Sequence, residues 1–446
     1  MTDSARLVVV GGGLAGCEAA LQAVRCGVPV TLYEMKPVRF SPAHASPDLA
    51  ELVCSNSLRG AGLGNAVGLL KEEMRRLGSR VIEAADETAV PAGGALAVDR
   101  QAFARRLSET VEAHPQIEIR RERVSSIPDD PFVVLATGPL TDPELAGDLQ
   151  RRLGESHLYF YDAISPIVYA DSIDHEVAFR ASRWQEGEGD YLNLPLDRTA
   201  YETFVAALVE AETVPLHPFE AKLYFEACLP IEEMARRGPK TLAFGPMKPV
   251  GLVDPRSGRR PHAVVQLRQE DKRGVLYNLV GFQTKLRVGE QKRILRMLPG
   301  LEQAAFARFG SVHRNTYLNA PRQLSPDLEL RARPGVFVAG QLAGVEGYVE
   351  SAALGFLAGI HAACALRGER PPEPDPSTAH GALLRHLREA RAKGFQPMNV
   401  NFGLFPPLDD VPRGTKKRER NERMSARGLA ALEPYRAALA RLRTDP

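Results

Sequence analysis

The fold is decided by the stretch Arg6-Leu7-Val8-Val9-Val10-Gly11-Gly12-Gly13-Leu14-Ala15-Gly16. It joins a short β-branched run, typical of a buried parallel strand, to a turn that fits G-x-G-x-x-G. Residues 17–26 then predict a helix that ends at Gly27, and residues 28–33 predict a second strand that ends at Glu34. The segment therefore reads as one strand–helix–strand unit.

This unit has the pattern of a dinucleotide-binding site. Glycine residues let the backbone approach a pyrophosphate at a helix N-terminus, and an acid about 20 residues further on accepts a hydrogen bond from a ribose hydroxyl. Glu34 lies 18 residues after Gly16. We predict cofactor contacts at Glu34 and along the turn, at Gly11, Gly12, Gly13, Leu14, Ala15 and Gly16. The motif alone fits FAD, NAD or S-adenosylmethionine equally well.

Two later segments favour FAD. Val133–Gly138 reads as a strand that ends in Ala-Thr-Gly, and Val336–Gln341 as a strand that ends in Ala-Gly-Gln. With the N-terminal unit, they resemble the glutathione-reductase-like FAD proteins, and this resemblance adds Gly340 and Gln341 to the expected cofactor contacts. Gln341 stands where those proteins commonly have Asp.

The predicted fold class is α/β: a Rossmann-like FAD-binding domain of glutathione-reductase type with an inserted smaller α/β domain. We expect the FAD-binding domain to comprise residues 1–95, 131–165 and 331–446. The inserted domain, which would bind the substrate, is expected to comprise 96–130 and 166–330.

Composition places the chain among globular proteins. It has 446 residues, 44% of them hydrophobic, and a net charge of +2, which excludes a disordered protein. Its five cysteines form no C-x-x-C pair, so we expect no zinc ribbon. We expect the cysteines to be free thiols in a cytoplasmic protein. We expect no signal sequence, because no apolar h-region lies ahead of the first predicted strand. The longest apolar stretch, 351–366, contains Gly355, Gly359 and His361, so we expect a buried helix and no membrane span.

Two cysteines are candidates for chemistry. Cys54 lies among small polar residues, and Cys228 lies just ahead of Pro230 and a predicted helix, where the helix dipole favours a thiolate. Cys17, Cys26 and Cys364 lie in apolar helical surroundings and are expected to be small buried residues.

Several longer segments match one family. They are Gly11–Ala20, Val53–Leu58, Val90–Arg100, Phe225–Glu233, Phe244–Leu252 and Gly344–Ala352. The chain resembles TrmFO, the folate- and FAD-dependent tRNA (uracil-5-)-methyltransferase family, which is related to the GidA (MnmG) flavoproteins. The resemblance runs from residue 7 to about 407.

The resemblance implies an enzyme that makes 5-methyluridine at position 54 of the tRNA T loop. Methylenetetrahydrofolate would supply the carbon, reduced FAD the electrons, and NADPH or NADH would reduce the flavin. A thiolate that adds to uracil C6 makes C5 nucleophilic, and a base then removes the C5 proton. In the family, the cysteine matching Cys228 is the proposed nucleophile, and the one matching Cys54 has a supporting acid/base or thiol role near the flavin.

Basic residues are candidates for contact with tRNA phosphates. Residues 413–427 hold seven Arg or Lys and two Glu, which fits either a solvated helical face or a phosphate-binding patch. The candidates are Arg256, Arg259, Arg260, Lys285, Arg287, Lys416, Lys417 and Arg418. We predict no metal, no membrane association and no obligate protein partner.

Three other readings remain open. A GidA-like enzyme would install carboxymethylaminomethyl groups on wobble uridine, but fewer residues follow Leu366 than the extra helical domain of those proteins needs. An S-adenosylmethionine methyltransferase is disfavoured by the strand at 336–341. A flavin-bearing, non-catalytic tRNA-binding module is disfavoured by the settings of Cys54 and Cys228.

Overall fold

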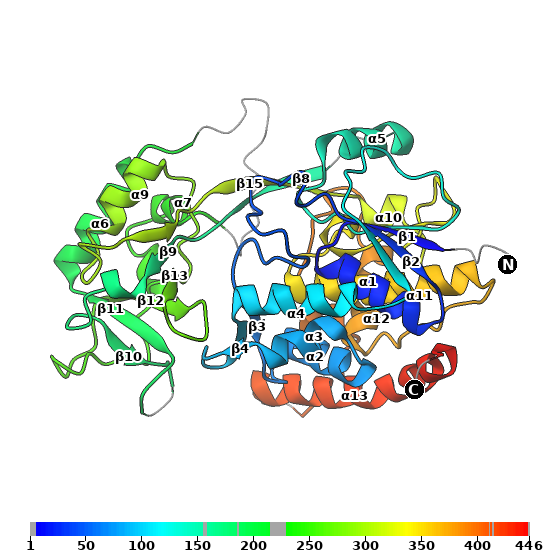
Figure 1. Ribbon diagram of the computed structural model, residues 1–446. Helices are drawn as coiled ribbons and strands as arrows, with labels where there is room; N and C mark the ends of the chain where they lie inside the picture. The colour runs from blue at the N-terminus through cyan, green and yellow to red at the C-terminus, as the bar shows by residue number, and fades with distance from the viewer. Residues whose placement is uncertain are drawn as a thin grey trace.

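The computed structural model describes residues 6–154, 158–184, 187–214, 229–409, 411–412 and 414–444. Figure 1 shows two lobes joined by a pair of long strands. Each lobe has its own sheet and its own main cluster of buried apolar side chains.

The first lobe is built on a five-stranded parallel sheet in the order β16-β7-β1-β2-β6. Its strands are β1 Leu7–Val10, β2 Val30–Tyr33, β6 Ile117–Arg120, β7 Val133–Leu135 and β16 Val336–Val338. All residues of β1, β7 and β16 are buried. This explains their unbroken apolar sequences, because a parallel sheet is covered on both faces.

Helices and a small antiparallel sheet complete this lobe (Figure 1). The sheet has the order β3-β5-β4, with β3 Ser57–Gly60, β4 Ala89–Val90 and β5 Ala95–Val98. The α-helices are α1 Leu14–Arg25, α2 Ala66–Leu77, α3 Arg80–Glu87, α4 Arg100–Glu112, α5 Pro143–Leu153, α10 Ala320–Gln323, α11 Tyr348–Leu366, α12 Ala379–Glu389 and α13 Lys417–Leu442. Two 3₁₀ turns, η3 Gly340–Ala343 and η4 Phe402–Leu404, also belong to it.

The second lobe contains a six-stranded antiparallel sheet in the order β10-β11-β12-β13-β9-β14. Its strands are β9 Ile167–Tyr169, β10 Phe179–Ala181, β11 Tyr191–Leu196, β12 Ala263–Gln269, β13 Leu276–Leu279 and β14 Phe306–Arg308. Its helices are η1 Ala170–Ser172, α6 Arg198–Glu210, α7 Ile231–Arg236, α8 Thr241–Phe244 and α9 Val288–Leu295. Strands β8 Leu158–Ala163 and β15 Val312–Tyr317 pair antiparallel between the lobes (Figure 1).

Residues 96–130 lie in the first lobe, so placing them in the inserted domain was wrong. Strand β6 pairs with β2 as an edge of the parallel sheet, and Phe103 and Leu107 of α4 belong to the first core. Residues 317–330 also contribute to that core through Tyr317 and Leu324. The chain therefore returns to the first lobe earlier than its sequence pattern indicated.

Helix α11 is buried as predicted. Within the described residues it is the one helix long and apolar enough to cross a membrane, and 83% of its apolar window is buried inside the protein. Its glycines allow close packing on α1: a Cβ at Gly355 would lie 2.2 Å from the Ala15 carbonyl oxygen, and one at Gly359 would lie 2.3 Å from that of Ala19. The glycines that argued against a membrane span thus let two core helices approach closely.

Candidate functional site

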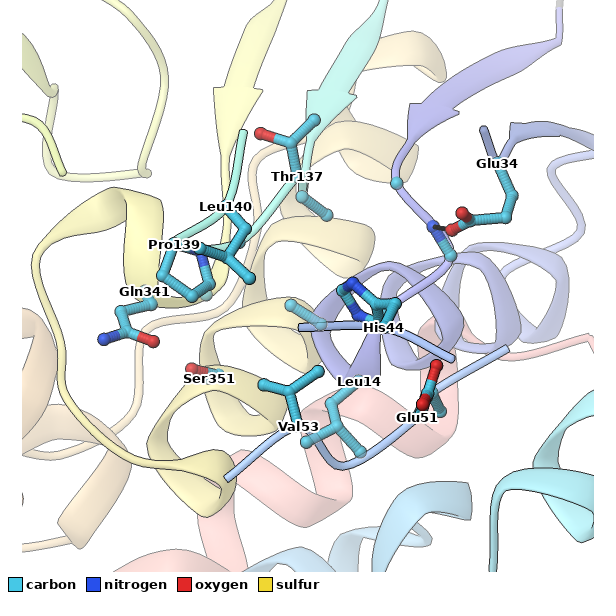
Figure 2. A pocket seen from close by; sticks show the side chains of 18 of the residues that line it. Leu14, Glu34, His44, Glu51, Val53, Thr137, Pro139, Leu140, Gln341 and Ser351 are labelled. Carbon is cyan, nitrogen blue, oxygen red and sulfur yellow. Dashed lines mark hydrogen bonds between the residues drawn. The ribbon is translucent and has the colours of Figure 1, made fainter. Parts of the chain in front are cut away.

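A pocket opens where β1, β2 and β7 end, at the carboxyl edge of the parallel sheet, which is where ligands bind in open α/β sheets. It is lined by most of the predicted cofactor residues, namely Gly11, Gly12, Gly13, Leu14, Ala15, Glu34, Gly340 and Gln341. Figure 2 shows the side chains of Leu14, Glu34 and Gln341 around it. The structure thus brings together, around one pocket, predicted residues from three segments that are distant in the sequence.

The glycines of the turn have different roles. Gly11 has φ +104°, and a Cβ there would lie 2.6 Å from the Ala136 carbonyl oxygen. A Cβ at Gly16 would lie 1.7 Å from the Gly11 oxygen, so Gly16 lets the helix approach the strand and does not line the pocket. Gly13 differs from both, because a Cβ there would meet nothing within 4 Å. It therefore leaves open space at the N-terminus of α1.

This opening fits a dinucleotide. Gly13 is the N-cap of α1 and offers no side chain to the free N–H groups of the first turn, so those groups and the helix dipole can receive a pyrophosphate. Glu34 is buried at the end of β2, and its carboxylate accepts from the N–H groups of Gly12 (2.8 Å) and Lys36 (2.9 Å). The acid is thereby fixed at the rim of the pocket, as the ribose contact requires.

The corner at Gln341 contains a carboxylate that the sequence reading missed. Gln341 Nε2 donates to the side chain of Glu346, and both residues line the pocket. Gly340 has φ +69° and lies against Ala15, because a Cβ there would be 2.8 Å from the Ala15 Cβ. Glu346 thus brings an acid to the corner where glutathione-reductase-like proteins commonly have Asp.

Cys54 lines the same pocket and is half-buried. Its backbone N–H donates to the Tyr348 hydroxyl oxygen at 2.7 Å, and its carbonyl accepts from Arg100 Nη2 at 3.2 Å. Tyr348 begins helix α11, so two distant parts of the first lobe fix the Cys54 backbone.

The second lobe also holds the Cys54 loop. Arg268 of β12 donates through Nε to Asn56 Oδ1 (2.9 Å) and through Nη2 to Ser55 Oγ (2.6 Å). Asn56 is fully buried and donates to the carbonyls of both Val98 and Gln269. Burial lowers the pKa of Arg268. Side chains from both lobes therefore converge on residues 54–56.

His44 is a pocket residue that no sequence pattern indicated. It lies on the loop after β2, and its Nδ1 is 2.6 Å from Ser41 Oγ. Burial, followed by the charge of Lys36, lowers the pKa of His44, so the imidazole is neutral at pH 7. Figure 2 shows His44 and Glu51 beside the pocket.

The other cysteines divide as follows. Cys17, Cys26 and Cys364 are buried, as predicted. Burial raises the pKa of Cys17, and it raises the pKa of Cys364 to about 12, so neither is a thiolate at neutral pH. Cys228 lies outside the described residues.

The predicted phosphate-binding residues fall into two exposed groups and one exception. Arg256, Arg259 and Arg260 are exposed on the second lobe, as is Arg287, which pairs with Glu212 at 2.8 Å. Lys416, Lys417 and Arg418 are exposed at the start of α13.

Lys285 is the exception, and its prediction as a phosphate contact was wrong. Its side chain is buried, and Nζ lies 2.6 Å from Glu233 Oε1. The position on a loop beside Arg287 gave no sign that the ammonium group is enclosed and neutralised within the lobe.

Comparison with known proteins identifies the family. The family model described as "Glucose inhibited division protein A" matches residues 6–370. A protein of Geobacter sulfurreducens named methylenetetrahydrofolate–tRNA-(uracil-5-)-methyltransferase TrmFO is 58% identical over 434 residues, which cover 97% of this chain and 99% of that protein. The chain belongs to the TrmFO family. A Heliobacterium modesticaldum TrmFO is 56% identical over 97% of this chain and 98% of its own length.

Solved structures agree on the fold of this TrmFO family member. Two structures of Aquifex aeolicus GidA superpose with TM-scores of 0.69 and 0.67, at 18% and 17% identity. They cover 98% and 99% of this chain, and the matched parts are 78% and 76% of the GidA chains. A Rossmann-like flavoprotein fold with a second α/β lobe is therefore confirmed.

Proposed function

We propose that this chain methylates uracil C5 of the T-loop uridine at tRNA position 54, with methylenetetrahydrofolate as carbon donor. The observation that carries the proposal is the position of Cys54 in a member of the TrmFO family: a half-buried thiol lines the same pocket as the dinucleotide cradle. FAD, reduced by NADPH or NADH, supplies the two electrons that convert the transferred carbon to a methyl group. The reaction takes place in the cytoplasm.

The chain's own residues prepare the site for that chemistry. The N–H groups after Gly13 would hold the pyrophosphate of FAD and Glu34 its ribose, and Gln341 and Glu346 close the opposite corner of the pocket. Because α1 is capped by no side chain, these N–H groups are available to the cofactor. Binding there would bring the reduced cofactor to the pocket that Cys54 lines.

The two predicted cysteines divide the thiol chemistry. The Cys228 thiolate forms a bond to uracil C6, which makes C5 nucleophilic. C5 then bonds to the one-carbon unit, whose bond to the folate nitrogen breaks to release tetrahydrofolate. A base removes the C5 proton, and the S–C6 bond then breaks to return the thiolate. Cys54 moves a proton or assists as a second thiol, and Arg100 and Tyr348 hold its backbone in place.

The uridine must leave the stacked T loop to reach these thiols, and extruding a base costs a few kcal/mol. Phosphate contacts from Arg256, Arg259 and Arg260 on one lobe, and from Lys416, Lys417 and Arg418 on the other, would offset that cost. Both groups are exposed, so a backbone can reach them. Arg287 is a further candidate once its pair with Glu212 opens.

The decisive experiment supplies unmodified tRNA with ¹³C-labelled methylenetetrahydrofolate and NADPH. Mass analysis of the nucleosides should show labelled 5-methyluridine at position 54, and S-adenosylmethionine should not replace the folate. Label that never enters RNA would overturn the proposal, and a mass gain at the wobble uridine would indicate the GidA-type reaction instead.

Two variants test the cysteine roles. Cys228→Ser should keep FAD and fail to methylate, since a serine hydroxyl is not an anion at neutral pH. Cys54→Ser should impair turnover less completely, because a hydroxyl still relays a proton. Cys26→Ala is the control, because Cys26 is buried away from the pocket lining. A wild-type rate in Cys228→Ser would refute its assignment as the nucleophile.

A trapping experiment locates the nucleophile directly. With 5-fluorouridine at position 54, fluorine replaces the C5 proton and elimination is blocked. A covalent protein–RNA adduct should accumulate, and peptide mapping should place it on Cys228. An adduct on Cys54 would exchange the two roles.

A further inference from the structure

The second lobe carries a strongly basic surface segment, residues 236–260, which runs from the last residue of α7 through α8 to just before β12. It contains seven Lys or Arg and one acidic residue, Asp254, in a chain whose net charge is only +2. Asp254 is paired with Arg256 at 3.2 Å. All seven basic residues are exposed: Arg236, Arg237, Lys240, Lys248, Arg256, Arg259 and Arg260.

Four of these cations are available to an external anion. Lys240, Lys248, Arg259 and Arg260 make no ion pair within the described residues. On the neighbouring β10–β11 connection, Asp190 accepts from Gly93 N at 2.6 Å, and Glu188 lies 3.8 Å from Arg180. Segment 236–260 is therefore complementary in charge to a polyanion.

Two large aromatic side chains within or against segment 236–260 are exposed. Trp184, the only tryptophan of the chain, is 79% exposed, and Phe244 at the end of α8 is 82% exposed. Trp184 packs on segment 236–260, since a Cβ at Gly251 would lie 3.3 Å from its ring. Its neighbour Arg183 donates to the Lys248 carbonyl at 2.9 Å.

This surface is connected to the Cys54 loop. Strand β10 is the edge strand and pairs with β11 (Figure 1). Arg183 follows β10, and Tyr191 of β11 is the register partner of Arg268 in β12. Arg268 donates to Ser55, next to Cys54. The Tyr191 hydroxyl also donates to the Ala92 carbonyl of the first lobe at 3.0 Å. An RNA base stacked on Trp184 would therefore lie near the contact between the two lobes.

We propose that Trp184 and Phe244 form a stacking platform for unpaired bases of the tRNA substrate, with Lys240 and Lys248 on the adjoining phosphates. The inference rests on the proposed function and names a feature of the RNA that the site recognises. Unpaired bases stack on aromatic faces, whereas a continuous duplex presents only phosphates and groove edges. Exposed rings beside unpaired cations therefore fit a loop of RNA.

Trp184 supplies a direct readout of this contact. Its fluorescence in the full-length holoprotein should be quenched by a T-arm stem-loop transcript and not by a blunt RNA duplex of equal length. Quenching by both RNAs, or by neither, would overturn the platform. A fluorescence change caused by anionic phospholipid vesicles but not by the stem-loop would also overturn it and assign the surface to membranes.

Variants separate stacking from charge. Trp184→Ala and Phe244→Ala should each weaken stem-loop binding by roughly 5-fold to 100-fold, with the salt dependence unchanged because the net charge stays the same. Lys240→Gln with Lys248→Gln should instead flatten the slope of log affinity against log salt by about one unit for each phosphate that is no longer neutralised. Tyr169→Ala is the control, because Tyr169 is 42% exposed on the same sheet but outside segment 236–260.

Binding and methylation are measured independently, so the two proposals can fail separately. Wild-type affinity in both alanine variants would overturn the platform even if the enzyme methylates tRNA. Normal quenching by the stem-loop with no label transfer from folate would overturn the proposed function and leave the platform intact.

Discussion

Replacing Gly355 with alanine should destabilise the first lobe and weaken FAD binding together. Gly355 lies within the buried helix α11, and its new Cβ would be 2.2 Å from the Ala15 carbonyl oxygen and 2.7 Å from the Ala15 Cα. These are backbone atoms and cannot rotate away. On its other side Ala15 is confined, because a Cβ at Gly340 would already be 2.8 Å from its Cβ.

The magnitude follows from two opposing terms. Ordinary carbon contacts are about 3.5–4.0 Å long, so α1 and α11 must separate by roughly 1 Å. Because the clash is with backbone atoms, its cost lies in the upper part of the usual overpacking range, at about 2–3 kcal/mol, and alanine returns at most about 1 kcal/mol of helix propensity. The net loss of about 1–2 kcal/mol would lower Tm by about 2–4 °C per kcal/mol in a unit of 150–250 residues.

The assay compares Gly355→Ala with two matched variants by thermal melting and FAD titration. Gly359→Ala makes an equivalent clash with Ala19, one turn further from the cradle, so it should lose stability but retain more FAD affinity. Gly147→Ala on α5 meets only Arg151 Nη1 at 3.6 Å and should be neutral or stabilising. Wild-type Tm and FAD affinity in Gly355→Ala would refute the packing argument.

Three further predictions address the cofactor, pH and RNA. Gly13→Val should yield a colourless protein whose Tm nearly equals that of the FAD-free wild type, because its side chain would fill only the space left for the pyrophosphate; retained FAD would contradict this. Burial lowers the pKa of Lys71 to about 7, whereas the unfolded value is about 10.4, so the unfolded chain binds more protons between these values. The contribution of neutral Lys71 to stability is therefore present above about pH 10.4 and lost as the pH falls to about 7. Between these values, the free energy of unfolding of the wild type should rise with pH relative to that of Lys71→Met, by up to about 1.4 kcal/mol per pH unit. Urea-unfolding profiles of the two proteins that run parallel with pH would contradict this prediction. Neutralising Lys416, Lys417 and Arg418 together should lower tRNA affinity and reduce the salt slope by up to about one unit for each phosphate that these residues neutralise, with FAD content unchanged; an unchanged slope would assign these residues to solvated surface.

That the glycine turn and Glu34 line one pocket could be predicted from sequence, because the determinants are local; their contacts with a cofactor stay a prediction. Strand β1, the glycine turn and helix α1 follow one another directly, and each has its own period and end signal. Gly340 and Gln341 were found by the same logic, because they end a strand of the same sheet. Glu346 was missed, because it follows the strand end by several residues and matches no motif, and only the fold brings its side chain to Gln341.

The features that depend on contacts between distant segments, such as the sheet to which a strand belongs or the burial of a charged side chain, could not be predicted from the sequence. Strand β6 is short and has only one buried residue, so nothing in its sequence distinguishes an edge strand of the first sheet from a strand of the second. Lys285 was misjudged for a related reason, because its partner Glu233 lies far away along the chain. Charge alone does not reveal burial.

Both lobes contribute hydrogen bonds to residues 54–56, so this loop links the position of one lobe to that of the other. The buried amide of Asn56 bridges a carbonyl of the first lobe, at Val98, and one of the second, at Gln269. A buried donor that loses its acceptor costs about 1–3 kcal/mol, so the lobes cannot shift relative to each other without disturbing the loop that carries Cys54. Arg100 makes a second connection between the lobes, because it pairs with Glu270 of the second lobe at 2.8 Å and also donates to the Cys54 carbonyl. The lobe that carries segment 236–260 thus also holds the loop of Cys54, which lines the cofactor pocket. If RNA binds that segment as proposed, the same few hydrogen bonds would link its position to that of Cys54.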